Sequence, residues 1–434
     1  MINRLKKLAS HQEFMKYFAN TSWLFFDKFF KMSVGFFILI YFTRYLGPEQ
    51  FGIFSYAQSF ISIFMILSSL GISQILIRDL VNHPEKRNIF LGNTFFITFI
   101  SSLIGVVLTI LFSKTFVDES ITQQIITILS FMIIFQNFNR IIDSYFQHKV
   151  LSKKIVYSST IGFTVYSFLR LYLIYIEADL IYFAWALLFN AFLLSVLFVY
   201  IYIKEEGSLK WTIDTKLMKE YLKSAIPLTV VAVSVFMYNR IDQLMLKHIL
   251  GNEAVGNYSA ATKVSELFYF LPGIIMISLY PKLIEIKKES EERYLQLLER
   301  SYRLIIWMSV PVALFLFVFS DFIISILYGE RFIQASSALK ILSWNIIFTS
   351  VGMVFVKILY IEHYEKKYMM RSISGMLINI VLNYMLIQIY GMAGAAMTTL
   401  ITLIVISYVY DLFDRDLRKF YFLKIKGFVP KFKE

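Results

Sequence analysis

Uncharged apolar runs about as long as a bilayer crossing recur along the whole chain, and they constrain the fold more than any other feature. A helix needs ~20 consecutive apolar residues to cross the hydrocarbon core. Because lipid offers the backbone no hydrogen-bond partners, spanning segments are helices unless a β-barrel pattern is present. These runs are continuously apolar and do not alternate with a period of two. The sequence therefore predicts an all-α polytopic membrane protein.

Twelve segments of this kind can be placed, so we expect about 12 transmembrane helices and both termini on one side. The segments are 21–45, 50–77, 88–113, 121–145, 155–176, 180–203, 222–247, 252–281, 301–320, 337–360, 368–389 and 392–412. The connecting segments on the side of the termini carry thirty lysines and arginines, whereas the opposite loops carry four. Positive charge marks the cytoplasmic side, so we expect both termini to be cytoplasmic.

The charge and cysteine content exclude several other classes of protein. A net charge of +13 is compatible with nucleic-acid binding, but the basic residues occupy every second loop, which indicates membrane orientation instead. The chain has no cysteine, which excludes disulfides and thiolate metal sites. The first 20 residues lack a compact apolar core and a small-residue cleavage site, so we interpret them as an interfacial amphipathic helix.

A short motif occurs twice and predicts an internal duplication. Leu46–Ala57 reads LGPEQFGIFSYA, Leu250–Ala261 reads LGNEAVGNYSAA, and six of the twelve positions are identical. The offset of 204 residues is close to half the chain. Each copy contains a glycine at which a helix can break and reverse. We therefore expect parallel repeats, with an N-terminal six-helix bundle at 1–203, a cytoplasmic linker at 204–221, a C-terminal bundle at 222–412 and a basic cytoplasmic tail at 413–434.

Signatures of enzyme chemistry are absent from the sequence. The five histidines are scattered at loop ends and form no metal-binding pair. No glycine-rich phosphate loop ends in Lys-Ser or Lys-Thr. We therefore expect neither an enzyme nor a resident metal or cofactor, and any transport would draw on an ion gradient, a partner or the substrate gradient.

Ionisable residues within the predicted spans are the main candidates for function, because each is costly in a bilayer unless it is paired or hydrated. Lys263 and Glu266 fall near the middle of their span and share a face. Arg240 and Asp242 are two residues apart, so they point in different directions and need separate partners. Arg170 has no carboxylate nearby in the sequence. These residues either line a hydrated pathway, where cations suit a phosphate or pyrophosphate, or form structural bridges between helices.

Other polar positions have two interpretations each. Asp27 either pairs with Lys31 four residues later or faces a cavity as a cation ligand. Arg44 and Arg78 are either anchors at helix ends or pathway residues. Asn379 and Asn383 share a face and either hydrogen-bond neighbouring helices or bind an ion. Five further charged residues near cytoplasmic ends are interpreted as interfacial, namely Arg140, Asp143, Arg303, Lys357 and Arg371.

Several segments together resemble the Wzx or RfbX-type polysaccharide biosynthesis flippases of the MOP superfamily. They are RYLGPEQFGIFSYAQSF and LSSLGISQILIRDL in the first half, and NRIDQLMLKHILGNEAVGNYSAATKVSELFYFLPGIIMISLYPKL, ILYGERFIQASSALKIL and YGMAGAAMTTLI in the second. The resemblance implies a MATE-like fold of two six-helix bundles in a V around a central cavity. It also implies alternating access that moves an undecaprenyl-diphosphate-linked oligosaccharide, for O-antigen or a similar surface polysaccharide, to the outer leaflet of the bacterial cytoplasmic (inner) membrane.

The same resemblance implies roles for individual residues and partners. Substrate would be held by Arg240, Lys263 and Arg170, with Glu266, Arg44 and Arg78 alongside. A coupling cation would lie among the seventh, eleventh and twelfth helices, at Asp242, Asn379, Asn383 and Thr398, with sodium, protons and no coupling all open. Partners would be the lipid-linked oligosaccharide, membrane lipids, and assembly proteins such as a polymerase or chain-length regulator, with no nucleic acid.

Two alternative functions make different predictions. A MATE-like multidrug or cation antiporter calls for a cavity rich in carboxylates, whereas the midplane residues here favour positive charge. A membrane polysaccharide polymerase or ligase calls for a large external loop with catalytic arginines or histidines. The external loops here are short, the longest being about 321–339.

Overall fold

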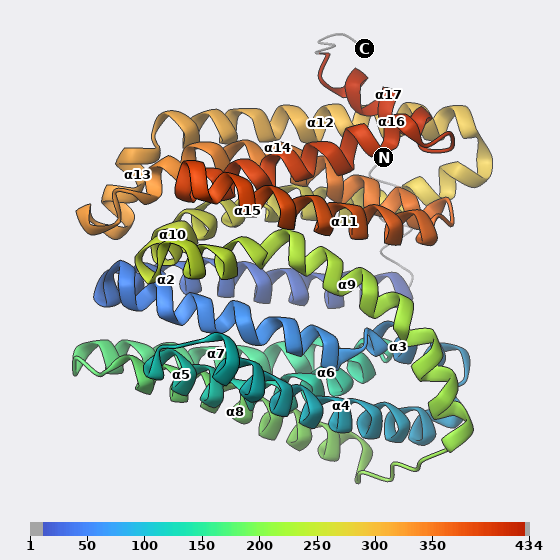
Figure 1. Ribbon diagram of the computed structural model, residues 1–434. Coiled ribbons are helices and arrows are strands. Elements are labelled where there is room, and N and C mark those ends of the chain that lie inside the picture. The colour runs from blue at the N-terminus through green and yellow to red at the C-terminus, as the bar shows by residue number, and fades with distance from the viewer. Residues whose placement is uncertain (1–11, 430–434) are drawn as a thin grey trace. The chain divides into compact units, whose positions relative to one another are not determined.

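The computed structural model describes residues 12–429, and this range is built from helices with no strand (Figure 1). The all-α fold class predicted from the apolar runs is therefore confirmed. Residues 1–11, which hold part of the expected N-terminal amphipathic helix, lie outside the described residues.

The helices follow one another with short connections. The first half contains α2 (Gln12–Ser69), α3 (Ile72–Asn82), η1 (Pro84–Lys86), α4 (Arg87–Phe116), α5 (Ser120–Ser130), α6 (Met132–His148), α7 (Ser152–Tyr175) and α8 (Leu180–Glu206). The second half contains α9 (Thr215–Leu250), α10 (Asn252–Leu267), α11 (Phe270–Glu289), α12 (Glu291–Val318), α13 (Ser320–Tyr328), η2 (Glu330–Phe332), α14 (Ala335–Ile361), α15 (Glu365–Ile404), the π-helix η3 (Val405–Val409), α16 (Tyr410–Phe413) and α17 (Arg418–Gly427).

Each of the twelve expected spans coincides with a helix, part of a helix or consecutive helices. Among the described residues, 8 helices are long and apolar enough to cross a membrane, or 9 if a bent pair is counted as one span. Two of these contain a glycine break and so hold two expected spans each: Gly47 (φ 70°) in α2 and Gly391 (φ 59°) in α15. Positive φ favours glycine. The chain is thus a multi-pass membrane protein.

Large apolar side chains remain exposed along several helices. Phe168 and Tyr175 on α7 and Tyr384 and Ile389 on α15 are each more than half exposed. In water such apolar surface would promote aggregation, whereas in a membrane it contacts the lipid tails. The distribution is that expected of spanning helices in contact with a bilayer.

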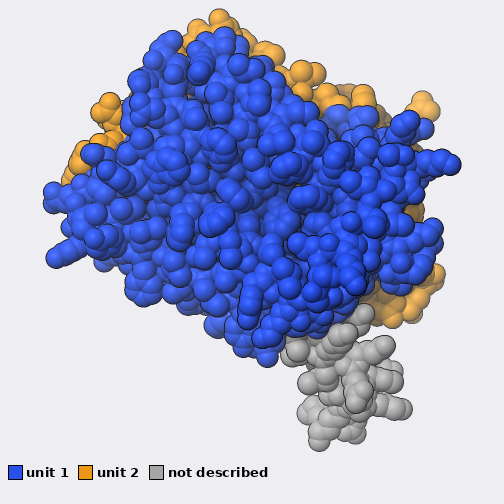
Figure 2. Space-filling view, turned by 90° about the horizontal axis from the view of Figure 1, so that it is seen from below, with its two compact units in different colours: residues 1–45, 60–232 blue, residues 46–59, 233–434 orange. Residues whose placement is uncertain are grey.

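The chain forms two compact units, and their boundary does not follow the chain order (Figure 2). Unit 1 contains the chain up to Tyr45 and then Phe60–Ala232. Unit 2 contains Leu46–Ser59 and everything from Val233 onward. The first copy of the duplicated motif therefore belongs to the same unit as the second copy.

The two copies of the motif cross each other within unit 2 at equivalent glycines. A Cβ added to Gly52 would lie 1.8 Å from the carbonyl oxygen of Asn252, and one added to Gly256 would lie 1.9 Å from that of Pro48. Only glycine permits this approach of the two backbones. Polar contacts extend the crossing, because the Ser59 hydroxyl donates to Gln243.

The segment that joins α8 to α9 is fixed to unit 1. The Thr212 amide donates to the Asn88 carbonyl at 3.1 Å, and the Asn93 side chain exchanges two hydrogen bonds with the Asp214 backbone. Gly92 lies directly beneath this segment, since a Cβ there would be 2.1 Å from the Thr212 carbonyl oxygen. The Asp214 carboxylate then accepts from the first amides of α9. The linker is thus an ordered connection.

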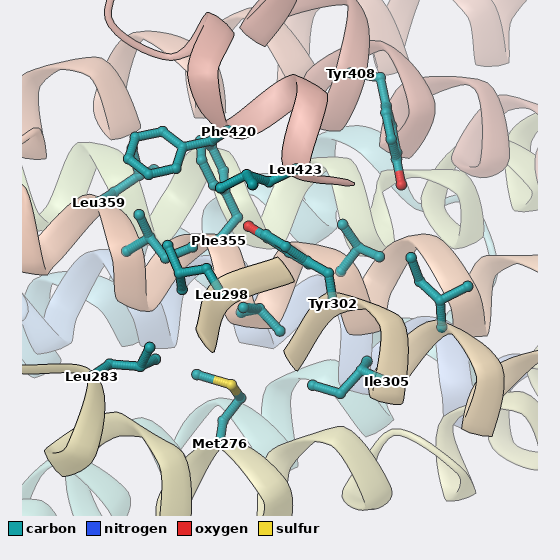
Figure 3. Packing of buried hydrophobic residues seen from close by; sticks show 14 of the residues in the cluster. Met276, Leu283, Leu298, Tyr302, Ile305, Phe355, Leu359, Tyr408, Phe420 and Leu423 are labelled. Atoms are coloured by element: carbon teal, nitrogen blue, oxygen red, sulfur yellow. The ribbon is translucent and has the colours of Figure 1, made fainter. Parts of the chain in front are cut away.

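The core of unit 2 is centred on α12, α14 and α17 (Figure 3). Tyr302 from α12, Phe355 from α14 and Phe420 from α17 are fully buried there, with Leu423 beside them. The helix α17 therefore continues the core of unit 2 beyond the last spanning helix, although its sequence reads as part of a basic tail.

Candidate functional site

An ionic cluster lies between α9 and α10 in unit 2. Arg240 Nη2 is 2.7 Å from Glu266 Oε1, and Lys263 Nζ is 4.0 Å from Glu266 Oε2. Glu266 therefore lies within ion-pair distance of both cations. The side chains of Arg240, Lys263 and Glu266 are 23%, 36% and 29% exposed, respectively. Partial exposure leaves the cations accessible to an anionic group.

A buried carboxylate occupies the other face of α9. Asp242 is 3% exposed, and its Oδ2 accepts a hydrogen bond from the Tyr258 hydroxyl and lies 3.5 Å from the Thr399 hydroxyl. Its Oδ1 accepts from the Gln243 amide at 2.8 Å. Arg240 and Asp242 therefore have separate partners, as their spacing of two residues predicts.

The two arms of α15 on either side of Gly391 meet through polar side chains. Asn383 donates to Asn379 Oδ1 at 2.8 Å, and Asn379 donates to the Thr402 hydroxyl at 3.2 Å. Asn379 thus makes a hydrogen bond to the other arm, whereas Asn383 bonds Asn379 on its own arm. Within the described residues, the fully buried oxygens Asn383 Oδ1 and Thr398 Oγ1 have no hydrogen-bond partner. Buried polar atoms are normally satisfied, so these oxygens retain the capacity to bind a ligand.

In unit 1, Asp27 lies among donors from α2 and α7. Lys31 Nζ is 2.6 Å from Asp27 Oδ1, which confirms the pairing predicted from their spacing. The Thr160 hydroxyl donates to the same oxygen at 3.0 Å, and Lys31 also donates to the Ser159 hydroxyl at 2.7 Å. The carboxylate is thereby satisfied by protein groups.

The remaining predicted residues of unit 1 are not gathered into one site. The Arg170 guanidinium stacks 3.5 Å from the centre of the Phe42 ring, and its Nε has no partner among the described residues. Arg78 is exposed and 2.7 Å from its neighbour Asp79, while Arg44 is exposed. The structure thus brings together Arg240, Lys263 and Glu266, and it leaves Arg44, Arg78, Arg170 and Asp27 in unit 1.

Sequence reasoning missed some of the residues around Asp242. Tyr258 and Thr399 contact Asp242, and Thr402 accepts from Asn379. A signal for Tyr258 was present, because the duplication aligns it with Phe54 and so shows an added hydroxyl. Among residues 12–429, no three His, Asp or Glu side chains could jointly hold a metal ion.

One interfacial interpretation is wrong. Arg371 is only 4% exposed, because its guanidinium donates into unit 2, to the Ile406 carbonyl and to the Ser407 hydroxyl at 3.1 Å. An arginine near a helix end usually reaches toward water. Here the end of α15 is covered by further protein.

Comparisons with known proteins agree across most of the chain. The model of a family described as polysaccharide biosynthesis protein matches residues 17–287, and the MatE model matches 227–385. A protein of Escherichia coli strain K12 named as an O-antigen transporter is 21% identical over 87% of this chain and 91% of its own length. The capsular polysaccharide biosynthesis protein CapF of Staphylococcus aureus is 24% identical over 86% of this chain and 94% of its own.

Solved structures share the fold. The lipid II flippase MurJ in an inward closed conformation matches with a TM-score of 0.75 and 16% identity, covering 93% of this chain and 90% of that one. An inward-facing multidrug transporter of the MATE family matches with a TM-score of 0.73 and 14% identity, covering 90% and 95%. At these identities the likeness concerns the fold alone.

Proposed function

Because this chain belongs to the family of polysaccharide biosynthesis proteins, we propose that it is a flippase for lipid-linked oligosaccharides. Its relatives include proteins named for O-antigen transport and for glycan flipping, which are transport roles, and one named for capsular polysaccharide biosynthesis. The proposed substrate is an undecaprenyl-diphosphate-linked oligosaccharide. The proposed direction is from the cytoplasmic to the outer leaflet of the bacterial inner membrane.

The observation that carries this proposal is the cationic cluster of Arg240 and Lys263. Charged side chains within spans are costly unless they serve a hydrated pathway, and both of these cations keep partial exposure beside Glu266. A diphosphate is the anionic group that these cations would bind. Arginine can bind phosphate oxygens with two parallel hydrogen bonds, while lysine acts as a point charge.

Alternating access would carry the head group across while the polyprenyl tail stays in lipid. Backbones in direct contact pack without intervening flexible side chains. The contact between Gly52 and Gly256 would therefore hold the two copies of the motif together within unit 2 during transport.

Surface polysaccharide in cells lacking the native gene tests the proposal. Complementation with Arg240→Ala or Lys263→Ala should abolish surface polysaccharide at normal protein levels. The exposed Lys282 pairs with Glu285 on α11 and provides the matched control, since Lys282→Ala should complement fully. Normal polysaccharide in both test variants would contradict the proposed roles. Single repeat units on the surface would indicate a polymerase instead.

For energy coupling we propose a monovalent cation bound beside Asp242. Asp242 is a buried carboxylate, and two buried oxygens on the arms of α15, Asn383 Oδ1 and Thr398 Oγ1, have no hydrogen-bond partner among the described residues. Hard cations favour such oxygen ligands. Flipping assayed in proteoliposomes with an imposed sodium or proton gradient tests this assignment. Both gradients should be without effect in Asp242→Asn, and transport in that variant that still follows a gradient would contradict it.

A further inference from the structure

A second buried ionic group lies at the opposite end of the last spanning helix, outside the proposed transport site. Lys424 of α17 and Asp411 of α16 form an ion pair in which both side chains are 0% exposed. Lys424 Nζ also donates to the Ser407 carbonyl at 2.9 Å. A fully buried lysine is rare, and here it is carried in by a ten-residue helix that follows the spans.

Lys424 and the neighbouring Arg371 donate hydrogen bonds to carbonyl oxygens of a distorted helical turn. Residues Val405–Val409 form a π-helix, in which backbone carbonyls depart from the α-helical pattern. The Ile406 carbonyl accepts from Arg371, and the Ser407 carbonyl accepts from Lys424. The two side chains therefore help to hold the π-helix, and one of them depends on the docking of α17.

Phe355 of α14 is flanked by both cations. Lys424 Nζ lies 3.4 Å from the centre of its ring, and the Arg371 guanidinium lies 4.6 Å from it. Such contacts are attractive for each cation when desolvated, but they supply no formal negative charge. The like charges of Arg371 and Lys424 are balanced by Asp411 alone.

The other titratable groups facing Lys424 are neutral phenols. Tyr302 of α12 and Tyr408 of η3 place hydroxyls in this core without a hydrogen-bond partner among the described residues. The ionic contacts of the first turn of α17 lie elsewhere, between Lys419 and the carboxylates of Glu291 and Glu362. At its other end, Arg303 donates to the Val429 carbonyl. The buried cluster therefore has net charge +1 when Lys424 is protonated and is neutral when it is not.

We propose that α17 is an acid-released latch on unit 2, in which protonation of Lys424 weakens the docking of the helix over the π-helix. Release would remove the lysine from the Ser407 carbonyl and let the turn relax. The π-helix begins six residues after Thr399, whose hydroxyl lies 3.5 Å from Asp242 Oδ2, so the latch sits on the same helix as a contact of that carboxylate. Only this consequence for transport rests on the proposed function.

The direction of the pH effect follows from the burial of the lysine. Desolvation lowers the pKa of Lys424 to about 7, even though Asp411 opposes the shift. The released helix would have an ordinary lysine pKa near ~10.4. Between these values the released form binds more protons, so docking strengthens as pH rises and weakens as pH falls. From pH 8.5 to pH 6 the released fraction should grow about 30-fold.

The absence of cysteine from the chain permits a direct test. A single cysteine is introduced by Leu423→Cys on the buried face of α17, or by Phe422→Cys on its exposed face. Maleimide labelling rates are measured on purified protein in detergent. The ratio of the two rates cancels the intrinsic pH dependence of the thiol. It should rise about 30-fold from pH 8.5 to pH 6, and a flat ratio would overturn the latch.

Substitution of the lysine identifies the responsible group. Adding Lys424→Met should flatten the ratio, whereas Lys426→Met, at an exposed position two residues away, should leave its slope unchanged. A slope that survives Lys424→Met would overturn the proposal. If Lys424→Met fails to give a monodisperse protein, hydrogen–deuterium exchange of residues 418–427 in the unmodified chain decides the question. Protection of these amides, corrected for the intrinsic pH dependence of amide exchange, must fall on acidification.

Discussion

The two copies of the duplicated motif share a backbone plan but differ in chemistry. Each places a helix before and after a glycine of positive φ, Gly47 in the first copy and Gly251 in the second. At the offset of 204 residues, the positions of the second-half polar cluster correspond to uncharged residues in the first half. Arg240, Asp242, Tyr258, Lys263 and Glu266 align with Phe36, Ile38, Phe54, Ser59 and Ser62. The backbone plan is therefore shared, while at these five positions charged side chains occur only in the second half.

The two halves differ at both members of one buried, hydrogen-bonded pair of side chains. Asp242 and Tyr258 are hydrogen-bonded to each other, and their counterparts Ile38 and Phe54 are both buried and apolar. A carboxylate and a hydroxyl are thus present together in one copy and absent together from the other. Removing both partners of a buried hydrogen bond costs little, whereas removing one leaves the other unsatisfied.

The largest effect should follow from converting the second copy into the first at this pair. Asp242→Ile with Tyr258→Phe should abolish transport yet preserve the fold, because the two apolar side chains satisfy each other. Asp242→Ile alone should lower the free energy of unfolding by about 1–3 kcal/mol, since the Tyr258 hydroxyl is left buried without its partner. Thermal unfolding and proteoliposome flipping measure the two quantities. Active transport in the double variant would show that the carboxylate is only structural.

The crossing of the two copies should be the next most sensitive feature. Gly52→Ala or Gly256→Ala places a methyl group within 2 Å of a backbone carbonyl oxygen, which has no flexible end that can move aside. The helices must separate, at a cost of about 1–3 kcal/mol or more. The melting temperature should fall by several degrees, at ~2–4 °C per kcal/mol. Gly273→Ala is the control, because nothing lies within 4 Å of the added Cβ. Equal stability of all three variants would contradict the contact.

A smaller effect on stability is expected at the ionic cluster. The Arg240–Glu266 pair is partly exposed, so Arg240→Ala should change the free energy of unfolding by no more than about 1 kcal/mol. Transport should fall much further than stability, and Arg240→Lys should recover part of it, because the charge remains but the paired hydrogen bonds are lost. Equal activity of the Lys and Ala variants would argue against an anionic group at Arg240.

The fold follows from the sequence more readily than the site does. Apolar length predicted where α4, α8 and α14 lie, because crossing a bilayer is a property of each segment alone. The partners of Asp242 come from α10 and from the far arm of α15, and no local pattern encodes that meeting. The burial of Lys424 could not be predicted either. The segment RKFYFLKIKG has the composition of a basic tail, and only the packing of α12 and α14 against it buries the lysine. Spacing predicted which residues share a face, but not what covers that face.

The smallest effect, and the sharpest contrast between the units, concerns the two carboxylates Asp27 and Asp242. Asp27 accepts from the cation Lys31 and from Thr160, whereas Asp242 is buried and accepts from the Tyr258 hydroxyl and the Gln243 amide. Asp27→Asn should lower the free energy of unfolding by less than about 1 kcal/mol, as is usual for a partly exposed pair. It should also leave the response of transport to sodium and proton gradients unchanged. Proteoliposome assays at matched gradients compare it with Asp242→Asn. A lost response in Asp27→Asn and a retained one in Asp242→Asn would move the coupling site to unit 1, because the carboxylate that binds the coupling ion cannot be neutralised without consequence.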